Sequence, residues 1–255
     1  MLRLTPCLVA AAAFAGCAAH PGQRHPATDL RLSSHYASTD NDPPLPTLAV
    51  WPLPHEGAFG AGGAAPACLS PTLSFACTGL CPTPLADAFD RFGALMFFAG
   101  SPSDAVGSAF VTALNVTVSA DAHLALGVSE NYTLTIPTGI GADTVAVLTA
   151  DTQWGALRGL ETFSQLWVWS GRDVPVSYCT ATANLALTDY PKFSWRGLLI
   201  DSSRHFLPVS AVLKTIDAMS FNKLNTLHCE LRRRLAWGRA GLFFSARGSP
   251  SLPHH

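Results

Sequence analysis

Apolar and polar residues alternate one for one in two segments near the middle of the chain. In Leu114–Val118 and in Tyr132–Ile136, every second residue is apolar and the residues between are Asn or Thr. Since successive side chains of a strand point to opposite faces, this pattern predicts strands with one buried and one solvent-facing side. The segment Thr144–Leu148 predicts a third strand.

Two other segments have the wider spacing of an amphipathic helix. Over Leu85–Phe98, apolar residues recur at helical intervals with charged residues between them. From about Thr152 to Trp169 a second helix is expected, with a buried stripe formed by Trp154, Leu157, Leu160 and Leu166. Helix, strands and helix in this order predict a small α+β domain, which we place at residues 48–188.

The pattern changes after Tyr190-Pro191. The short apolar run Trp195–Ile200 predicts a buried strand, and Pro208 suits the first turn of a following helix. Leu224–His228 predicts another strand, so residues 192–228 are expected to form a parallel β-α-β unit. The helix between the strands has one apolar face, formed by Val209, Val212, Leu213, Ile216 and Met219.

The start of the chain differs from the rest. Residues 1–19 combine Arg3 with an apolar run and small residues before His20, which predicts a secretory signal peptide. An uncleaved anchor and a lipoprotein site at Cys17 are the alternatives. Residues 20–47 have the composition of a flexible linker. The signal peptide predicts a protein of the secretory pathway, in a lysosome or vacuole or outside the cell.

Composition narrows the class of protein. The 255 residues are 48% apolar and 13% charged, with a formal net charge of -1. This favours a folded core, and it argues against nucleic-acid binding through a broad basic face. Gly57–Ala65 is rich in glycine, but no strand pattern precedes it, so we interpret it as a flexible loop. No Walker A, H-E-x-x-H or G-x-S-x-G motif occurs, and no cofactor is expected.

Secretion also decides how the cysteines are interpreted. Disulfides are the default in an oxidising compartment, and the candidates are Cys68, Cys77, Cys81 and Cys179, with Cys229 left over. Three pairings of the four candidates are possible. No second cysteine pair follows at zinc-ligand spacing, so no metal site is expected. Two sequons, at Asn115 and Asn131, predict N-glycosylation in a eukaryotic host; unmodified strand-edge asparagines are the alternative.

The candidate chemistry lies just past the strand Trp195–Ile200. In parallel α/β architectures, sites gather at the carboxyl ends of the strands, where Asp201, Arg204 and His205 stand here. The five donors of Arg204 suit adjacent sugar hydroxyls or a carboxylate. The alternative is that Arg204 only pairs with Asp201, and that His205 is a structural histidine.

Several motifs closely resemble the eukaryotic, lysosomal-type β-N-acetylhexosaminidases of glycoside hydrolase family 20. The resemblance covers residues 48–228, and its most specific part is the block from Arg196 to Pro208. It also rests on these segments: Trp51-Pro-Leu-Pro54, Glu130-Asn-Tyr-Thr-Leu-Thr-Ile136, Gly155–Leu166 and Asn222-Lys-Leu-Asn225.

The resemblance implies an α+β domain followed by a (β/α)8 barrel, of which residues 192–228 are the start. It implies release of terminal N-acetylglucosamine or N-acetylgalactosamine from glycoproteins, glycolipids or chitooligosaccharides, in enzymes that dimerise when full-length. Arg204 matches the arginine that binds the terminal sugar; Asp201 and His205 belong to the same strand motif. The implied mechanism is substrate-assisted: an Asp orients the substrate acetamide and the adjacent Glu protonates the leaving oxygen.

The chain departs from the family after His228. Residues 229–255 hold five of the 16 basic residues and do not follow the family pattern, and no Asp-Glu dipeptide occurs in the 255 residues. We therefore expect the barrel to be truncated and this chain to have no hydrolytic activity. A non-enzymatic glycan-binding or subunit-like fragment is the alternative, and a misassembled sequence without a physiological product is a third.

Overall fold

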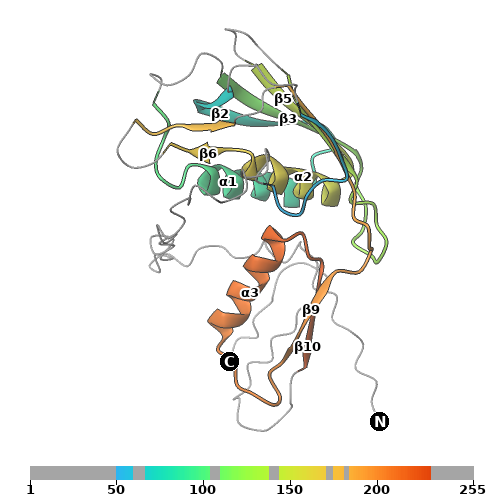
Figure 1. The fold of residues 1–255 in the computed structure, drawn as a ribbon. Coiled ribbons are helices and arrows are strands. Elements are labelled where there is room, and N and C mark those ends of the chain that lie inside the picture. The colour runs from blue at the N-terminus through green and yellow to red at the C-terminus, as the bar shows by residue number, and fades with distance from the viewer. Residues whose placement is uncertain are drawn as a thin grey trace, which may run out of the picture.

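The computed structural model describes residues 50–59, 67–103, 110–137, 144–170, 175–180 and 184–230. The expected signal peptide, the linker 20–47 and most of the segment 229–255 lie outside the described residues. In the described part, an eight-stranded sheet and two helices form one layered domain, and a smaller β-α-β unit lies below it (Figure 1). None of the described helices is long and apolar enough to cross a bilayer.

The large sheet is mixed, with the strand order β1-β8-β4-β5-β3-β2-β7-β6. Strands β2, β3 and β5 run parallel to one another, and the other pairs are antiparallel. The strands are β1 (Glu56–Phe59), β2 (Ala67–Gly79), β3 (Phe110–Ala120), β4 (Tyr132–Ile136), β5 (Thr144–Thr152), β6 (Val168–Trp169), β7 (Tyr178–Thr180) and β8 (Leu185–Asp189).

Helices α1 (Thr83–Met96) and α2 (Gln153–Gln165) cover one face of the sheet (Figure 1). Buried and exposed residues alternate along β4, β5 and β8, as expected for a sheet that packs on one side only. The hydroxyl of Thr152 caps α2 by accepting from the backbone N–H groups of Trp154 and Gly155. The predicted α2 stripe of Trp154, Leu157, Leu160 and Leu166 is buried.

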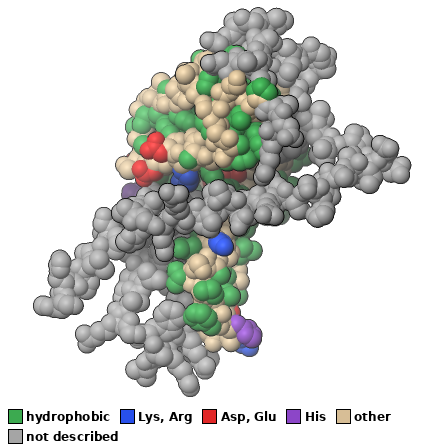
Figure 2. All heavy atoms as spheres, turned by 90° about the vertical axis from the view of Figure 1, so that its left-hand side faces the viewer, with side chains coloured by type: hydrophobic (Ala, Val, Ile, Leu, Met, Phe, Trp, Pro, Cys, Tyr) green, Lys and Arg blue, Asp and Glu red, His purple; other side chains and the backbone are tan. Residues whose placement is uncertain are grey.

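The β-α-β unit consists of β9 (Gly197–Asp201), α3 (Val209–Phe221) and β10 (Thr226–Glu230). The two strands are parallel and pair from Gly197↔Thr226 to Asp201↔Glu230. Much of the unit's apolar surface is open: Leu199 is 62% exposed and Leu213 43%. Figure 2 shows apolar side chains on the surface of this unit. Two strands cannot enclose a barrel core, and the open face follows from that.

Several predicted bounds are wrong. The second helix ends at Gln165, and Val168–Trp169 pair with β7 as strand β6. The loop expected at Gly57–Ala65 begins as strand β1, which pairs with β8; residues 60–66 lie outside the described part. The strand expected at Leu224–His228 is shifted by two residues, to Thr226–Glu230. Residues 226–230 are the ones whose backbone pairs with β9, so strand pairing and not apolar content sets the bounds of β10.

Strand β2 has no counterpart among the sequence predictions. Pro71 lies inside it, and the register with β3 shifts between Leu69 and Ser74. In this bulge the Ser70 hydroxyl accepts a hydrogen bond from the backbone N–H of Thr72 at 3.1 Å. Proline and a broken alternation are signs against a strand, so the sequence pattern could not show this one.

Two disulfides join four of the cysteines. Cys68–Cys179 links β2 to β7 at directly paired positions, across 111 residues of sequence, whereas Cys77–Cys81 spans only four. Loop-closure entropy assigns about 5 kcal/mol of stabilisation to the first and about 2 kcal/mol to the second. The sequence left three pairings open, and the paired register of β2 and β7 decides between them.

Candidate functional site

Asp201 organises the turn at the carboxyl end of β9. Its Oδ1 accepts hydrogen bonds from the backbone N–H of Ser203 at 3.0 Å and of Arg204 at 3.2 Å, and from the Ser203 hydroxyl. The Ser203 hydroxyl, followed by these backbone donors and the Arg204 charge, holds the pKa of the Asp201 carboxyl below its ordinary value. Asp201 therefore stays charged and fixes where Arg204 leaves the strand.

Arg204 forms the ion pair with Asp201 that the sequence analysis considered, but this pair involves only one nitrogen of its guanidinium. Its Nε lies 3.0 Å from Oδ2 of Asp201, while its side chain is 83% exposed. The two terminal amino groups have no hydrogen-bond partner among the residues described. The pair with Asp201 thus engages Nε and leaves the two terminal amino groups of the guanidinium exposed.

His205 is the third residue that the sequence places at this turn, and it is exposed to solvent. Figure 2 shows histidine and basic side chains together at the end of the β-α-β unit farthest from the large sheet. Asp201, Arg204 and His205 are therefore neighbours on one open turn, not the lining of an enclosed pocket. A pocket elsewhere, lined by Leu126, Trp154 and Thr226 among others, lies at the opposite end of β9.

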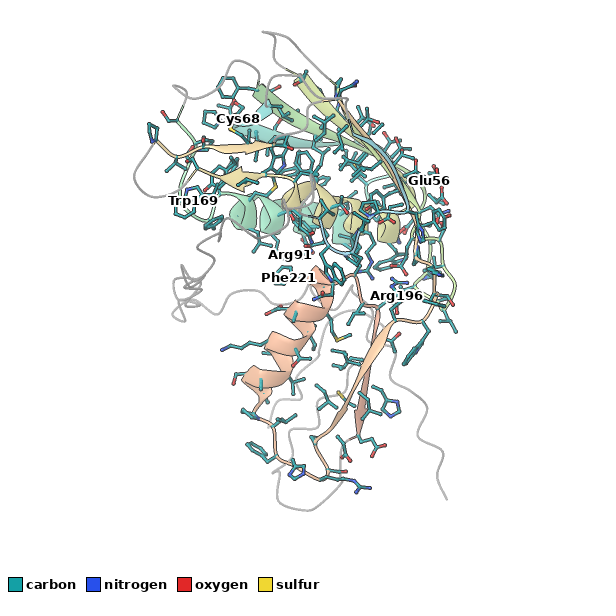
Figure 3. All side chains as sticks on the ribbon, viewed as in Figure 1. Glu56, Cys68, Arg91, Trp169, Arg196 and Phe221 are labelled. Atoms are coloured by element: carbon teal, nitrogen blue, oxygen red, sulfur yellow. A yellow bond between two sulfur atoms is a disulfide. The ribbon has the colours of Figure 1, made fainter. Side chains whose placement is uncertain are left out.

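A buried ionic cluster joins the β-α-β unit to the large domain at that opposite end. Glu130, 5% exposed, accepts hydrogen bonds at 2.6 Å from Nε of Arg158 in α2 and from Nη2 of Arg196. Its second carboxylate oxygen accepts from Nδ2 of Asn225 at 3.2 Å. Figure 3 shows Arg196 at the start of β9, where the two parts of the molecule meet. One carboxylate thus holds α2, β9 and β10 together.

Lys223 makes a second connection across the same junction. Its ammonium donates to Oδ2 of Asp189 at 2.9 Å, to the hydroxyl of Tyr132 at 2.9 Å and to that of Thr162 at 2.7 Å. The Tyr132 hydroxyl donates in turn to Asp189 at 2.8 Å. All four side chains are buried, and every donor of the ammonium has an acceptor, which is the condition for burying a charge without a large penalty.

The backbone of Lys223 explains how its side chain reaches the sheet. The residue follows the end of α3 with a φ of 54°. The N–H of Lys223 donates to the carbonyl of Ser220, and that of Leu224 donates to Met219, which together form a Schellman motif. Glycine is the usual residue at this left-handed position. Lysine adopts this less favourable backbone conformation here, and from this position its ammonium reaches the buried acceptors of the large domain.

Burial and charge shift the protonation of the junction groups. Burial opposes ionisation of Glu130, but Arg158 and Arg196 outweigh it and hold the pKa below its ordinary value. Burial lowers the pKa of Lys223, and Asp189 partly offsets this. Burial, together with the Asp189 carboxylate, raises the pKa of the Tyr132 hydroxyl. The junction therefore combines charged side chains with the neutral Tyr132 hydroxyl in a buried place.

Sequence reasoning missed this junction, although it quoted the segments that form it. Glu130, Arg158, Arg196, Lys223 and Asn225 belong to four separate motifs of the resemblance, and the fold brings them to one place. One feature of the sequence could have indicated the junction: charged side chains occur within segments that are otherwise largely apolar. Sequence spacing could not show that these charges meet, because up to 95 residues separate them.

The two sequons lie in different settings. Asn115 is in the middle of β3, paired with Ala76 and Val147, on the sheet face opposite α1 and α2. Asn131 is exposed directly before β4. The alternative to glycosylation was an unmodified asparagine at a strand edge; Asn131 lies at such an edge, whereas Asn115 is central in its strand.

Two family descriptions match the chain, one for each part of the structure. "Beta-acetyl hexosaminidase like" matches residues 50–166, and "Glycosyl hydrolase family 20, catalytic domain" matches residues 193–239. Together they span more than half of the sequence. The chain belongs to glycoside hydrolase family 20. The second match runs past His228, where the resemblance drawn from the sequence ends.

Relatives in this family support the assignment. The human beta-hexosaminidase subunit beta is 40% identical over 184 residues, which are 68% of this chain and 31% of that protein. Beta-hexosaminidase 1 of Arabidopsis thaliana is 37% identical over 196 residues, which are 70% of this chain and 35% of the relative. The chain thus spans about a third of the length of these family members.

Solved structures of the family share the fold. The chitobiase of Flavobacterium johnsoniae superposes with a TM-score of 0.56 at 24% sequence identity, over 72% of this chain and 27% of that one. At this identity the likeness concerns the fold alone. Family 20 membership and the fold agree with the sequence expectation of an α+β domain followed by a β-α-β unit.

Proposed function

We propose that this chain is part of a secreted, lysosomal or vacuolar β-N-acetylhexosaminidase that releases terminal N-acetylglucosamine or N-acetylgalactosamine from glycoconjugates. The observation that carries the proposal is the position of Arg204. It stands at the carboxyl end of the first parallel strand of a unit that matches the family's catalytic domain, and its two terminal amino groups have no partner within the described part of the chain. The names of the human and Arabidopsis relatives support the same activity.

In this proposal the β-α-β unit is the start of a (β/α)8 barrel. Arg204 binds hydroxyls of the terminal sugar, and Asp201 holds it in place through the 3.0 Å ion pair. The substrate's acetamide oxygen attacks the anomeric carbon, and an adjacent Asp-Glu pair supplies orientation and the proton. The 255 residues contain no Asp-Glu dipeptide. We therefore propose that this polypeptide by itself does not hydrolyse glycosides.

The first test is the transcript. Sequencing its 3′ end shows whether the reading frame continues through further barrel units with an Asp-Glu pair, as the enzyme proposal requires. A confirmed stop after His255 in abundant mRNA would favour the second candidate, a glycan-binding fragment. The exposed guanidinium of Arg204 is the observation that supports this candidate. Binding of N-acetylglucosamine to the purified chain, observed by NMR and lost in Arg204→Ala, would support it further.

Activity provides the quantitative test. On a chromogenic N-acetylglucosaminide, the 255-residue chain should give no turnover above buffer. In a longer product with the complete barrel, Arg204→Ala should lower kcat/KM about 100-fold, since charge-assisted hydrogen bonds to substrate are lost. Lys214→Ala, at an exposed position of α3, is the matched control and should leave kcat/KM unchanged. Equal activity of Arg204→Ala and wild type would refute the role of Arg204.

N-glycosylation at Asn115 and Asn131 is a further proposal for the chain made in a eukaryotic host. Asn131 is exposed, and Asn115 lies on the sheet face that no described helix covers. Treatment with a peptide N-glycosidase should reduce the mass of the secreted chain and convert each glycosylated Asn to Asp. An unchanged mass for the secreted wild type would contradict the proposal at both sites.

A further inference from the structure

The two disulfides differ sharply in their access to solvent. Cys68 is 2% exposed and its bond to Cys179 lies between paired strands. Cys81 is exposed, Cys77 is half-buried, and their bond closes a five-residue turn between the end of β2 and the start of α1. Cys179, the partner of Cys68, is half-buried like Cys77, so the contrast lies between the buried Cys68 and the exposed Cys81. A thiolate in solution can therefore reach a sulfur of the second bond directly, whereas the first bond is shielded on its Cys68 side.

The fold around the Cys77–Cys81 bond does not depend on it. β2 pairs with β3 as far as Gly79↔Val118, so ladder pairing holds Cys77 on its own. α1 is anchored by the buried side chains of Leu85 and Phe92. Because the bond joins residues only four apart, it restricts the unfolded chain much less than Cys68–Cys179 does. Its cleavage should leave both elements in place.

The position of Cys81 favours a reactive sulfur. It immediately precedes Pro82, the N-cap of α1, and the helix has no side-chain cap and no acidic residue in its first turn. Cys81 thus lies one residue before the N-cap of α1, and the N-terminal end of a helix favours a negative charge. Gly79, with a φ of 83°, forms the turn that brings the two sulfurs together.

We propose that Cys77–Cys81 is a thiol–disulfide exchange site whose reaction partner is a dithiol. A thiolate of the partner attacks Sγ of Cys81, the Cys77–Cys81 bond breaks, and Cys77 leaves as a thiolate that takes up a proton. The partner's second thiolate then attacks the partner's own sulfur in the mixed disulfide and releases Cys81 as a thiolate. The partner is oxidised to a disulfide by two electrons, and the turn is reduced to two thiols.

Dithiothreitol is a suitable probe for this exchange. The full chain is treated with graded concentrations under native conditions, alkylated and mapped by peptide mass spectrometry, with circular dichroism recorded in parallel. Cys77 and Cys81 should become alkylated at a dithiothreitol concentration at least ~10-fold below that needed for Cys68 and Cys179, with an unchanged spectrum. Simultaneous reduction of both disulfides, or loss of the spectrum when Cys77–Cys81 opens, would overturn the proposal.

Single variants test whether the Cys81 thiolate, which is released in the second step, is the more stabilised of the two. The two variants are compared at a pH below the ordinary thiol pKa. Cys81 in Cys77→Ser should react with an aromatic disulfide reagent about 10-fold faster than Cys77 does in Cys81→Ser. Peptide mapping separates this reaction from that of other cysteines. A faster Cys77 would refute the proposal that the start of α1 stabilises the Cys81 thiolate. The Cys77→Ser/Cys81→Ser double variant should keep the native spectrum, which separates loss of exchange from loss of fold.

Discussion

Glu130→Gln is expected to lower the free energy of unfolding by about 3 kcal/mol. The amide keeps the shape of the carboxylate but removes its charge. This leaves the buried Arg158 and the partly buried Arg196 without their shared counter-ion. Urea unfolding measures the loss. Hydrogen exchange at the amides of β9 and β10 should rise as well, because the β-α-β unit is held to the large domain at this point.

The pH dependence of the same variant checks the cause. Because the pKa of Glu130 is below the ordinary 4.5, its ion pairs stabilise the fold above that pH and lose their effect as pH falls through the lowered value. The difference between wild type and Glu130→Gln should therefore shrink in acid. Arg204→Gln, which removes an exposed ion pair, is the matched control and should change stability little. An equal loss in both variants, or a difference independent of pH, would contradict the assignment.

Gly155→Ala is expected to destabilise the protein by a similar amount, about 3 kcal/mol. A Cβ at this position of α2 would stand 2.3 Å from the carbonyl oxygen of Asn131 and 3.1 Å from the carbonyl carbon of Glu130. Both neighbours are backbone atoms, so no side chain can move aside, and either the helix or the segment before β4 must shift. The melting temperature should fall by roughly 6–12 °C.

Gly93→Ala is the matched control for this prediction. Gly93 also lies inside a helix, α1, but a Cβ there would meet only Cε2 of Phe75 at 3.7 Å, an ordinary contact. Alanine favours the helix over glycine by about 1 kcal/mol, so this variant should melt at the wild-type temperature or above it. If Gly155→Ala also keeps the wild-type melting temperature, the close approach of α2 to Asn131 is not a packing constraint.

The parts of the fold that were predictable are those in which one face of an element is buried and the other is wet. β4 was located to the residue because Tyr132–Ile136 alternates without interruption. β8 has the same alternation of apolar and polar residues, with Leu185 and Leu187 buried, but the sequence analysis did not predict this strand. β2 was not predictable, because Pro71 and the bulge break the alternation that a strand requires.

In helix α2, the periodic pattern of apolar residues did not predict which polar residues are buried. Its apolar stripe was correct, but the polar residues between, such as Arg158 and Glu161, are buried too. Periodicity assigns such residues to solvent. Here the β-α-β unit lies below the helix (Figure 1), and Nη2 of Arg158 donates to its Leu224 carbonyl at 3.4 Å. Arg158 also shares Glu130, from the large domain, with Arg196, and no single segment of sequence contains these partners.

The sequence by itself determined the family, the α+β order of the elements and the place of Arg204, because local spacing and a contiguous motif carry that information. Only the tertiary structure decided the disulfide pairing and the ionic junction of Glu130 and Lys223. Both depend on which distant residues the folded chain brings within hydrogen-bonding or bonding distance. The strength of the interactions between the charges at that junction depends on the exclusion of water, and only the assembled core excludes water.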